Sequence, residues 1–340
     1  MRPFTYQRPD TINAAVIAAS PTNRTNLPPV QAPVQFIAGG TNMADYMRLG
    51  VMQPASLVDL NGLVDQSLRR IEITREGIRF GALVRMADAA EHADVKGVYP
   101  VIAESLKLAA SGQIRNMATL GGNVLQRPRC EYFREISWAC NKRNPGSGCS
   151  ALDGVNRQHA ILGGSENCIA TYHGDFAQAL IALDATLDVV NRAGLRTIPF
   201  AELHVKPGQT PNVETVLAPG DIIVSLFVPA GPHTMRSRYL KIRDRQSYAF
   251  AIASAAVALD MDGDTVRDAR IALGGVATVP WRAHSAEAML RGKVLDVEAA
   301  TGAAEAAFVD AVPRQYNGFK VPLGKETLVR ALLETRDMVV

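Results

Sequence analysis

Short apolar runs bounded by Gly, Pro and Asp recur along the whole chain and predict strands. Some of these runs alternate apolar with polar residues, as expected for a strand with one buried face. The run at 250–260 is apolar throughout and fits either a strand or a buried helix. The other predicted strands cover residues 4–6, 56–60, 68–74, 187–191, 196–199, 220–229, 238–243 and 266–273.

Segments that fit helices lie between these strands, and the first follows a capping residue, Asp10 or Thr11. Such a mixture of strands and helices predicts an α+β class. A linker with Gly and Pro at 230–234 divides the chain into two expected domains, residues 1–230 and 235–340. The predicted helices cover residues 11–20, 85–92, 100–110, 175–185, 283–290, 297–309 and 325–336.

Composition narrows the class of protein. The 340 residues are 47% hydrophobic and 20% charged, which is ordinary for a globular protein long enough for two or three domains. A net charge of +3 is too small to indicate nucleic-acid binding. No apolar run reaches the roughly 18 residues of a membrane span. The N-terminus has neither the apolar core of a signal peptide nor a twin arginine, so we expect no self-directed export.

A strand, a glycine turn and a helix follow one another over residues 34–49, and Gly39 and Gly40 form the turn. A turn without Cβ atoms lets backbone N–H groups approach a pyrophosphate. The segment is not G-x-G-x-x-G, so the usual Rossmann signature is absent. A tight turn without any ligand is the alternative.

A second glycine segment, at 111–123, is predicted to be a loop that directly follows the helix predicted at 100–110. Thr119 offers a hydroxyl, Gly121 and Gly122 offer bare backbone, and Asn123 tolerates a left-handed turn. Two Gly-Gly turns, each beside a Thr, favour a dinucleotide held from both sides.

All four cysteines lie in one basic, loop-like segment, with the spacing Cys-x9-Cys-x8-Cys-x18-Cys. Thiolates favour zinc, copper(I) or iron–sulfur clusters. The short Cys pairs of zinc ribbons are missing, and widely spaced single ligands suit a bulky cluster. Zinc, two disulfides and free thiols stay as alternatives. The four cysteines are Cys130, Cys140, Cys149 and Cys168.

The surroundings of these cysteines fit four thiolates. Five cations would offset the negative charge, and the Gly-Ser-Gly at 146–148 lets the backbone close around a cluster and donate N–H groups to sulfur. The cations are Arg127, Arg129, Arg134, Lys142 and Arg143.

The two glycine segments resemble the FAD loops of the medium subunit of molybdenum hydroxylases, the family of xanthine dehydrogenases, carbon monoxide dehydrogenases and aldehyde oxidoreductases. Residues 272–277 and 280–283, with Glu287, resemble its C-terminal domain. The resemblance implies a two-subdomain FAD-binding fold of the PCMH type. A C-terminal α+β domain of the CO dehydrogenase flavoprotein type would follow it.

Most members of this family lack the cysteine segment. Residues 126–130, 140–149 and 157–160 resemble a bacterial periplasmic aldehyde oxidoreductase whose FAD subunit carries an additional 4Fe-4S cluster. This similarity favours iron–sulfur over zinc and places the cluster in an insertion at about 124–170.

The resemblance also implies which residues bind FAD. The first loop would wrap the pyrophosphate and the second would close on it. Asp175 would lie near the ribityl or ribose hydroxyls, Ile223 near the flavin, and Lys241 near the isoalloxazine. The implied residues are Gln35, Phe36, Ile37, Ala38, Gly39, Gly40, Thr41, Asn42, Met43, Thr119, Gly121, Gly122, Asn123, Asp175, Ile223 and Lys241.

By the same resemblance, the chain is an electron-transfer subunit of an oxidoreductase heterotrimer. A large subunit would hold a molybdenum cofactor and a small one two 2Fe-2S clusters. Electrons would leave this chain for an external acceptor, and we expect no catalytic acid–base pair here. The compartment would be cytoplasmic, or periplasmic by co-export with a partner that carries a twin-arginine signal.

Three alternatives stay open. The chain could be the FAD subunit of a xanthine, CO or N-heterocycle dehydrogenase. It could also be a stand-alone FAD reductase of the same fold, or a metal-bound interaction module. Absorption bands of flavin with iron–sulfur, of flavin alone, or of neither would separate an electron-transfer subunit from the last two.

Overall fold

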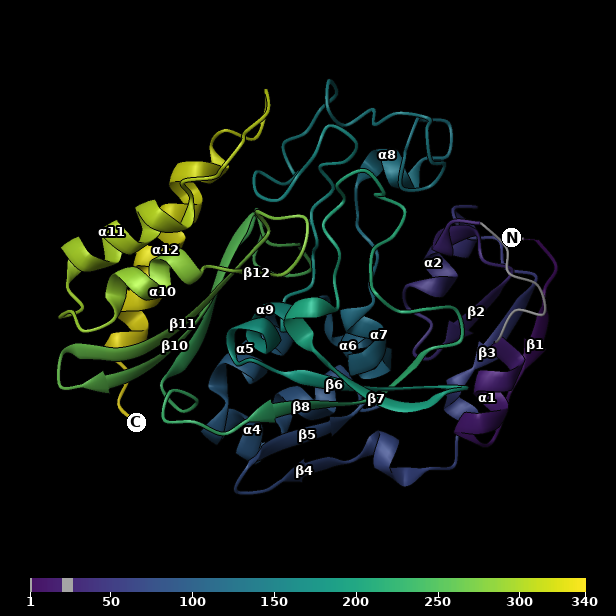
Figure 1. Cartoon of the computed structure of the whole chain (residues 1–340), viewed down its shortest axis with the longest axis horizontal. Coiled ribbons are helices and arrows are strands. Elements are labelled where there is room, and N and C mark those ends of the chain that lie inside the picture. Colours follow the sequence, from purple (N-terminus) through teal and green to yellow (C-terminus); the bar gives the residue numbers. More distant parts are fainter. Residues whose placement is uncertain (1, 20–26) are drawn as a thin grey trace.

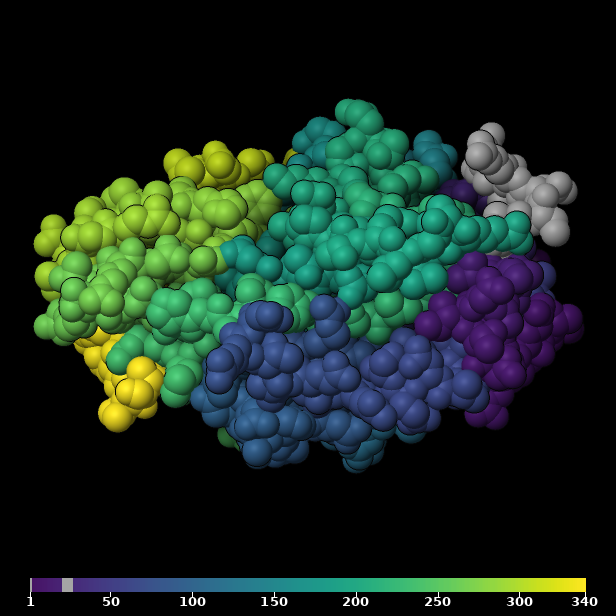
Figure 2. All heavy atoms as spheres, turned by 60° about the horizontal axis from the view of Figure 1, so that its bottom comes forward, coloured from purple at the N-terminus to yellow at the C-terminus, as the bar shows by residue number. Residues whose placement is uncertain are grey.

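The computed structural model describes residues 2–19 and 27–340, which form three sheets with helices between and around them (Figure 1). This confirms the α+β class. The N-terminal residues lie at one end of the molecule and the C-terminal sheet and helices at the other (Figure 2). No helix in the described ranges is both long and apolar enough to cross a membrane.

The first sheet is parallel, with strand order β1 (Thr5–Gln7), β3 (Ser56–Asp59) and β2 (Val34–Ile37). Helices α1 (Ile12–Ala19) and α2 (Met43–Arg48) follow β1 and β2 along the chain, since parallel neighbours need a crossover. The predicted helix at 11–20 is confirmed as α1, and its last residue, Ser20, lies outside the described residues. The glycine turn therefore emerges from the carboxyl end of β2.

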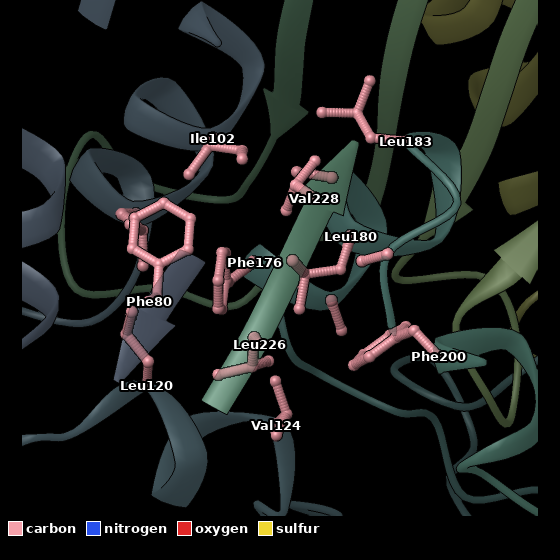
Figure 3. Close-up of a cluster of buried hydrophobic side chains, with 14 of the residues drawn as sticks. Phe80, Ile102, Leu120, Val124, Phe176, Leu180, Leu183, Phe200, Leu226 and Val228 are labelled. Atoms are coloured by element: carbon pink, nitrogen blue, oxygen red, sulfur yellow. The ribbon is translucent and has the colours of Figure 1, made fainter. Parts of the chain in front are cut away.

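The second sheet is antiparallel, and its central strand β8 (Ile222–Pro229) pairs with strands from distant parts of the chain. One face of β8 packs on buried helices through Leu226 and Val228, next to Phe80 and Phe176 (Figure 3). The rings of Phe80 and Phe176 meet edge to face with centroids 6.4 Å apart. The other strands are β4 (Ile71–Ile73), β5 (Gly77–Gly81), β6 (Thr186–Asn191) and β7 (Gly194–Pro199).

Helices of the middle of the chain cover this core or lead toward the cysteine segment. The longest of them, α5 (Pro100–Leu108) and α9 (Phe176–Ala182), contribute many fully buried residues. The others are α3 (Met86–Glu91), α4 (Ala93–Val98), α6 (Gly112–Met117), α7 (Leu120–Val124) and α8 (Glu131–Arg134).

The third sheet has the order β12 (Trp281–Arg282), β11 (Thr265–Gly274), β10 (Ala253–Asp262) and β9 (Ser237–Ile242). The ambiguous run at 250–260 is the strand β10, whose small side chains are buried along seven successive positions. Helices α10 (His284–Leu290) and α12 (Lys320–Arg336) pack on this sheet, and α11 (Val297–Ala307) packs against both of them (Figure 1).

One predicted strand was too long. Residues 68–74 contain only the short strand β4, because residues 66–69 form a 3-10 turn. The side chain of Asp65 caps this turn by accepting a hydrogen bond from the backbone N–H of Ser67 at 2.9 Å. The capping hydrogen bond therefore favours a turn at the start of this segment, although the alternating pattern of apolar and polar residues predicts a strand.

Lys320 joins the C-terminal helices to the cysteine segment. Its fully buried Nζ donates hydrogen bonds to the carbonyl of Gly275 at 2.7 Å and to that of His159 at 3.0 Å. Burial lowers the pKa of Lys320 to about 7, helped by nearby Arg157. The amine therefore serves as a hydrogen-bond donor. A positive charge on it destabilises the folded chain, because the amine is buried.

This burial predicts a pH dependence of stability. Between pH 7 and the usual pKa near 10.5 the unfolded chain binds more protons at Lys320 than the folded chain does, so its contribution to stability rises with pH. We expect the free energy of unfolding of the wild type, relative to Lys320→Met, to increase from pH 7 to pH 9.5 by on the order of a few kcal/mol. Urea unfolding at both pH values measures this.

The exposed Lys293 provides the control, because Lys293→Met leaves the buried amine in place. A difference between the wild type and Lys320→Met that does not change with pH would contradict the assignment.

Candidate functional site

A cavity of 1060 Å³ lies between the first sheet, the second sheet and the cysteine segment. Pockets for small molecules usually have volumes of about 300–1,000 Å³, and this cavity matches the largest of them. It is therefore large enough for a ligand the size of a dinucleotide. Most of the lining comes from five stretches of the chain, within 34–43, 118–129, 168–172, 212–223 and 245–250.

The first glycine turn forms one wall of this cavity. A Cβ on Gly39 would lie 2.1 Å from the carbonyl oxygen of Met117, so the two loops touch backbone to backbone. Gly40 has a φ of +73°, in the left-handed region that favours glycine. Both glycines are therefore required by the local structure, and all nine predicted residues from Gln35 to Met43 line the cavity.

The second glycine segment was expected to be an open loop, and this is wrong. It forms the two short helices α6 and α7, because Ser111 and Thr119 cap them. The Thr119 hydroxyl accepts a hydrogen bond from the N–H of Gly122 at 3.2 Å. Asn123 is helical, not left-handed. A Cβ on Gly121 would lie 3.0 Å from that of Ala82, so the glycine allows α7 to pack closely.

All four predicted residues of this second segment still line the cavity. Asn123 donates from Nδ2 to the sulfur of Met86 at 3.4 Å, while its buried Oδ1 has no partner among the described residues. A buried acceptor without a donor is costly, so it calls for a donor from a bound molecule. The cavity therefore fits a polar ligand such as a dinucleotide.

Asp175 and Lys241 lie outside this lining, whereas Ile223 on β8 belongs to it. Lys241 Nζ lies 2.8 Å from Asp175 Oδ2, and both side chains are almost completely buried. Burial raises the pKa of Asp175, and the positive charge of Lys241 opposes that rise. Tyr239 also donates to Asp175, at 2.6 Å. The cofactor contacts expected of these two residues stay a prediction, and in the structure the two side chains form a buried ion pair that links the start of α9 to β9.

The four cysteines converge on a second, much smaller cavity, which all of them line. Cys140 and Cys149 face each other as partners of an isolated antiparallel bridge, and Cys168 forms a similar bridge with Ser165. All four are free thiols. Over residues 2–19 and 27–340 no three His, Cys, Asp or Glu side chains are close enough to hold a single metal ion.

Burial disfavours negative charge on two of these sulfurs. It raises the pKa of Cys130 to about 12 and also raises the pKa of Cys140. Nearby backbone N–H groups oppose this effect, that of Phe133 at Cys130 and that of Arg143 at Cys140.

The other two cysteines influence each other. Their mutual hydrogen bond is the largest influence on both: it lowers the pKa of Cys149 to about 7 and raises the pKa of Cys168. The N–H of Ala170 lies 3.4 Å from the sulfur of Cys168. A backbone N–H group thus lies within hydrogen-bond distance of this sulfur.

The two cavities share part of their wall, namely Lys142, Cys168 and Ala170. Lys142 Nζ donates to the carbonyl of Pro211 at 2.8 Å and lies 3.4 Å from Glu214 Oε1. Burial acts to raise the pKa of Glu214, but Arg127 and Lys142 outweigh it and hold the pKa below its usual value. A charged cluster therefore occupies the boundary between the two sites.

Sequence reasoning missed two residues of this region. Glu214 lies in a loop that is far from the cysteines in sequence, and no local sequence pattern connects it with them. His159 was not among the predicted site residues, yet its Nε2 lies 3.2 Å from the sulfur of Cys130. Its position within the cysteine segment was the only signal that could have indicated a role at the sulfurs.

Comparison with known families assigns both parts of the chain. Residues 2–231 match the FAD binding domain in molybdopterin dehydrogenase. Residues 238–335 match the CO dehydrogenase flavoprotein C-terminal domain.

Individual proteins show the same similarity. The aldehyde oxidoreductase FAD-binding subunit PaoB of Escherichia coli (strain K12) is 44% identical over 339 residues, which cover 99% of each chain. The carbon monoxide dehydrogenase medium chain of Hydrogenophaga pseudoflava is 25% identical, over 97% of this chain and 96% of its own. A solved structure of carbon monoxide dehydrogenase from that organism superposes with a TM-score of 0.72 at 26% identity, and 98% of each chain is covered.

The glycine turns can be tested directly. We expect Gly40→Val and Gly122→Val to lose most of the bound FAD while the chain still folds, because each side chain would stand where backbone approaches the ligand. Flavin absorbance per chain measures occupancy, and circular dichroism measures folding.

Gly97→Val is the matched control, because a Cβ at Gly97 meets nothing within 4 Å. Full flavin occupancy in both loop variants would disprove the assignment of these turns.

Proposed function

The chain belongs to the FAD-binding medium subunits of the molybdenum hydroxylase family, and from this premise we propose that it is the electron-transfer subunit of an aldehyde oxidoreductase, holding FAD and a 4Fe-4S cluster. It would pass electrons from the molybdenum and 2Fe-2S subunits to an external acceptor. The observation that carries the proposal is the shared wall between the 1060 Å³ cavity and the pocket of four cysteines.

When bound, FAD and the cluster supply the electron-transfer chemistry, and the protein supplies position and electrostatics. In this proposal the backbone at 35–43 and Thr119, Gly121, Gly122 and Asn123 hold FAD, and Ile223 lies beside it. Asn123 Oδ1 accepts a hydrogen bond from the bound cofactor. Arg127 and Lys142 place positive charge at the boundary, where it favours added electrons on either side.

Cys130, Cys140, Cys149 and Cys168 are the proposed ligands of the cluster. Their convergence, their free thiols and the N–H groups around them support this assignment. Because three of the four are buried, the segment keeps water away from the sulfurs. The apolar neighbours Tyr132 and Phe133 close the pocket on one side.

Two partner subunits are part of the proposal. The similar proteins are named as medium chains or FAD-binding subunits, and this chain spans nearly their full length. We therefore propose a heterotrimer with a large molybdenum-cofactor subunit and a small 2Fe-2S subunit. Aldehyde is favoured over carbon monoxide as the substrate, because identity is 44% to the aldehyde enzyme and 25% to the other.

Purification with the co-expressed partner genes tests the proposed assembly. We expect one FAD and four irons per copy of this chain, and flavin bands over a broad iron–sulfur absorption. The complex should oxidise aldehydes, and the isolated chain should not. A stable monomer that oxidises aldehydes unaided would contradict the subunit role, and flavin without iron would contradict the cluster.

Single Cys→Ser variants test the four ligands. Each variant should lose the cluster or leave it degraded, because three thiolates leave one iron open, and residues 127–168 should become sensitive to protease. Iron content and EPR of the reduced protein report the cluster, while FAD occupancy should fall less.

Ser137→Ala serves as the control, since Ser137 is exposed in the same segment and does not line the pocket. If one cysteine variant keeps four irons and an unchanged EPR signal, that cysteine is not a ligand.

A further inference from the structure

His159 is the one histidine whose ring nitrogen is within hydrogen-bond distance of a cysteine sulfur in the described part of the chain. It is 4% exposed, and its Nε2 lies 3.2 Å from the Sγ of Cys130. A buried polar side chain aimed at a proposed ligand is unlike the scattered contacts of a surface histidine. Its role can be argued from what holds it and from which atom carries its proton.

The backbone of His159 is fixed from two sides. Its N–H donates to the carbonyl of Asn156 at 2.9 Å. Its own carbonyl accepts hydrogen bonds from Lys320 Nζ at 3.0 Å and from Asn317 Nδ2 at 3.3 Å. The C-terminal helix region thus holds this turn of the cysteine segment.

The ring itself is also oriented. It lies tilted against Tyr132, with centroids 6.1 Å apart, and Tyr132 comes two residues after Cys130. The Asn156 side chain accepts a hydrogen bond from the N–H of Tyr316 at 3.0 Å, which secures the start of the turn. Packing from both the cysteine segment and the C-terminal region therefore directs Nε2 toward the sulfur.

The identity of the partner decides which nitrogen of the ring is protonated. Nδ1 has no hydrogen-bond partner among the described residues. A coordinated thiolate sulfur can only accept a hydrogen bond, so the only bonded arrangement places the proton on Nε2. The ring then donates N–H to sulfur from a site that excludes water.

We infer that His159 is a positioning residue of the cluster site, which donates a hydrogen bond to the ligated sulfur of Cys130 and so makes the cluster easier to reduce. This inference rests on the proposed function, because it requires the cluster. Hydrogen bonds to the sulfurs raise the reduction potential of iron–sulfur centres, since they stabilise the more negative, reduced form. Lys320 and Asn317 act on the cluster only through the backbone of His159.

The purified complex with matched variants provides the test. His159→Phe keeps a ring of similar size and removes the donor, whereas His159→Gln restores an N–H in a similar place. His233→Phe is the control, because His233 is also buried and does not line the cysteine pocket. EPR-monitored titration measures the midpoint potential of the cluster, and iron analysis measures its content.

We expect four irons per chain in every variant. In His159→Phe the equilibrium constant for reduction should fall about tenfold, which is a shift of about 59 mV to more negative potential for one electron. His159→Gln should shift less, and His233→Phe should match the wild type. An unchanged potential in iron-replete His159→Phe overturns this inference alone. A wild type without iron overturns the proposed function and this inference with it.

A measurement on the wild type covers the case in which His159→Phe fails to assemble. With ¹⁵N-labelled histidine, electron–nuclear double resonance of the reduced complex should detect one weakly coupled histidine nitrogen. The absence of any coupling overturns the hydrogen bond. A strong coupling, typical of a nitrogen bound to iron, overturns the donor role.

Discussion

The close approach of two backbones, at Gly39 and Met117, is the constraint on which the larger cavity depends. A side chain at residue 39 would collide with the carbonyl of Met117, so only glycine lets the first turn meet helix α6. This contact joins the parallel sheet to the helical middle of the chain. The walls of the cavity are thereby fixed before any ligand binds, which lowers the entropy that binding would cost.

A second constraint is the burial of thiols and charges in the cysteine segment. Burial raises the pKa of Cys130 and Cys140, so without a positive centre these two sulfurs stay protonated thiols. Lys142 and Arg127 do not neutralise them directly, since both pair with Glu214. Lys320 joins this segment to the C-terminal part of the chain, because its amine donates to the carbonyl of His159 and to that of Gly275.

The sequence predicted most of the fold, because its apolar periods are local and strong. The strand β8 and the hairpin of β6 and β7 follow directly from the pattern. The predictions were wrong where a single capping side chain decided the local structure. Asp65 caps a turn where a strand was predicted, and Thr119 caps a helix where a loop was predicted. No local sequence pattern predicts the ion pair of Asp175 and Lys241, because the two residues lie far apart in sequence.

The predicted site residues also come from local patterns. The glycine turns line the larger cavity and the four cysteines line the smaller one, and each set consists of residues close together in the chain. Their common wall was beyond prediction, because it depends on how the loop near Glu214 folds back over Lys142. That wall brings a charged cluster between two sites that could otherwise work independently. Lys142 lines both cavities, and its ammonium group is within 3.4 Å of Glu214 in a partly desolvated place where Coulomb interactions are stronger than in water.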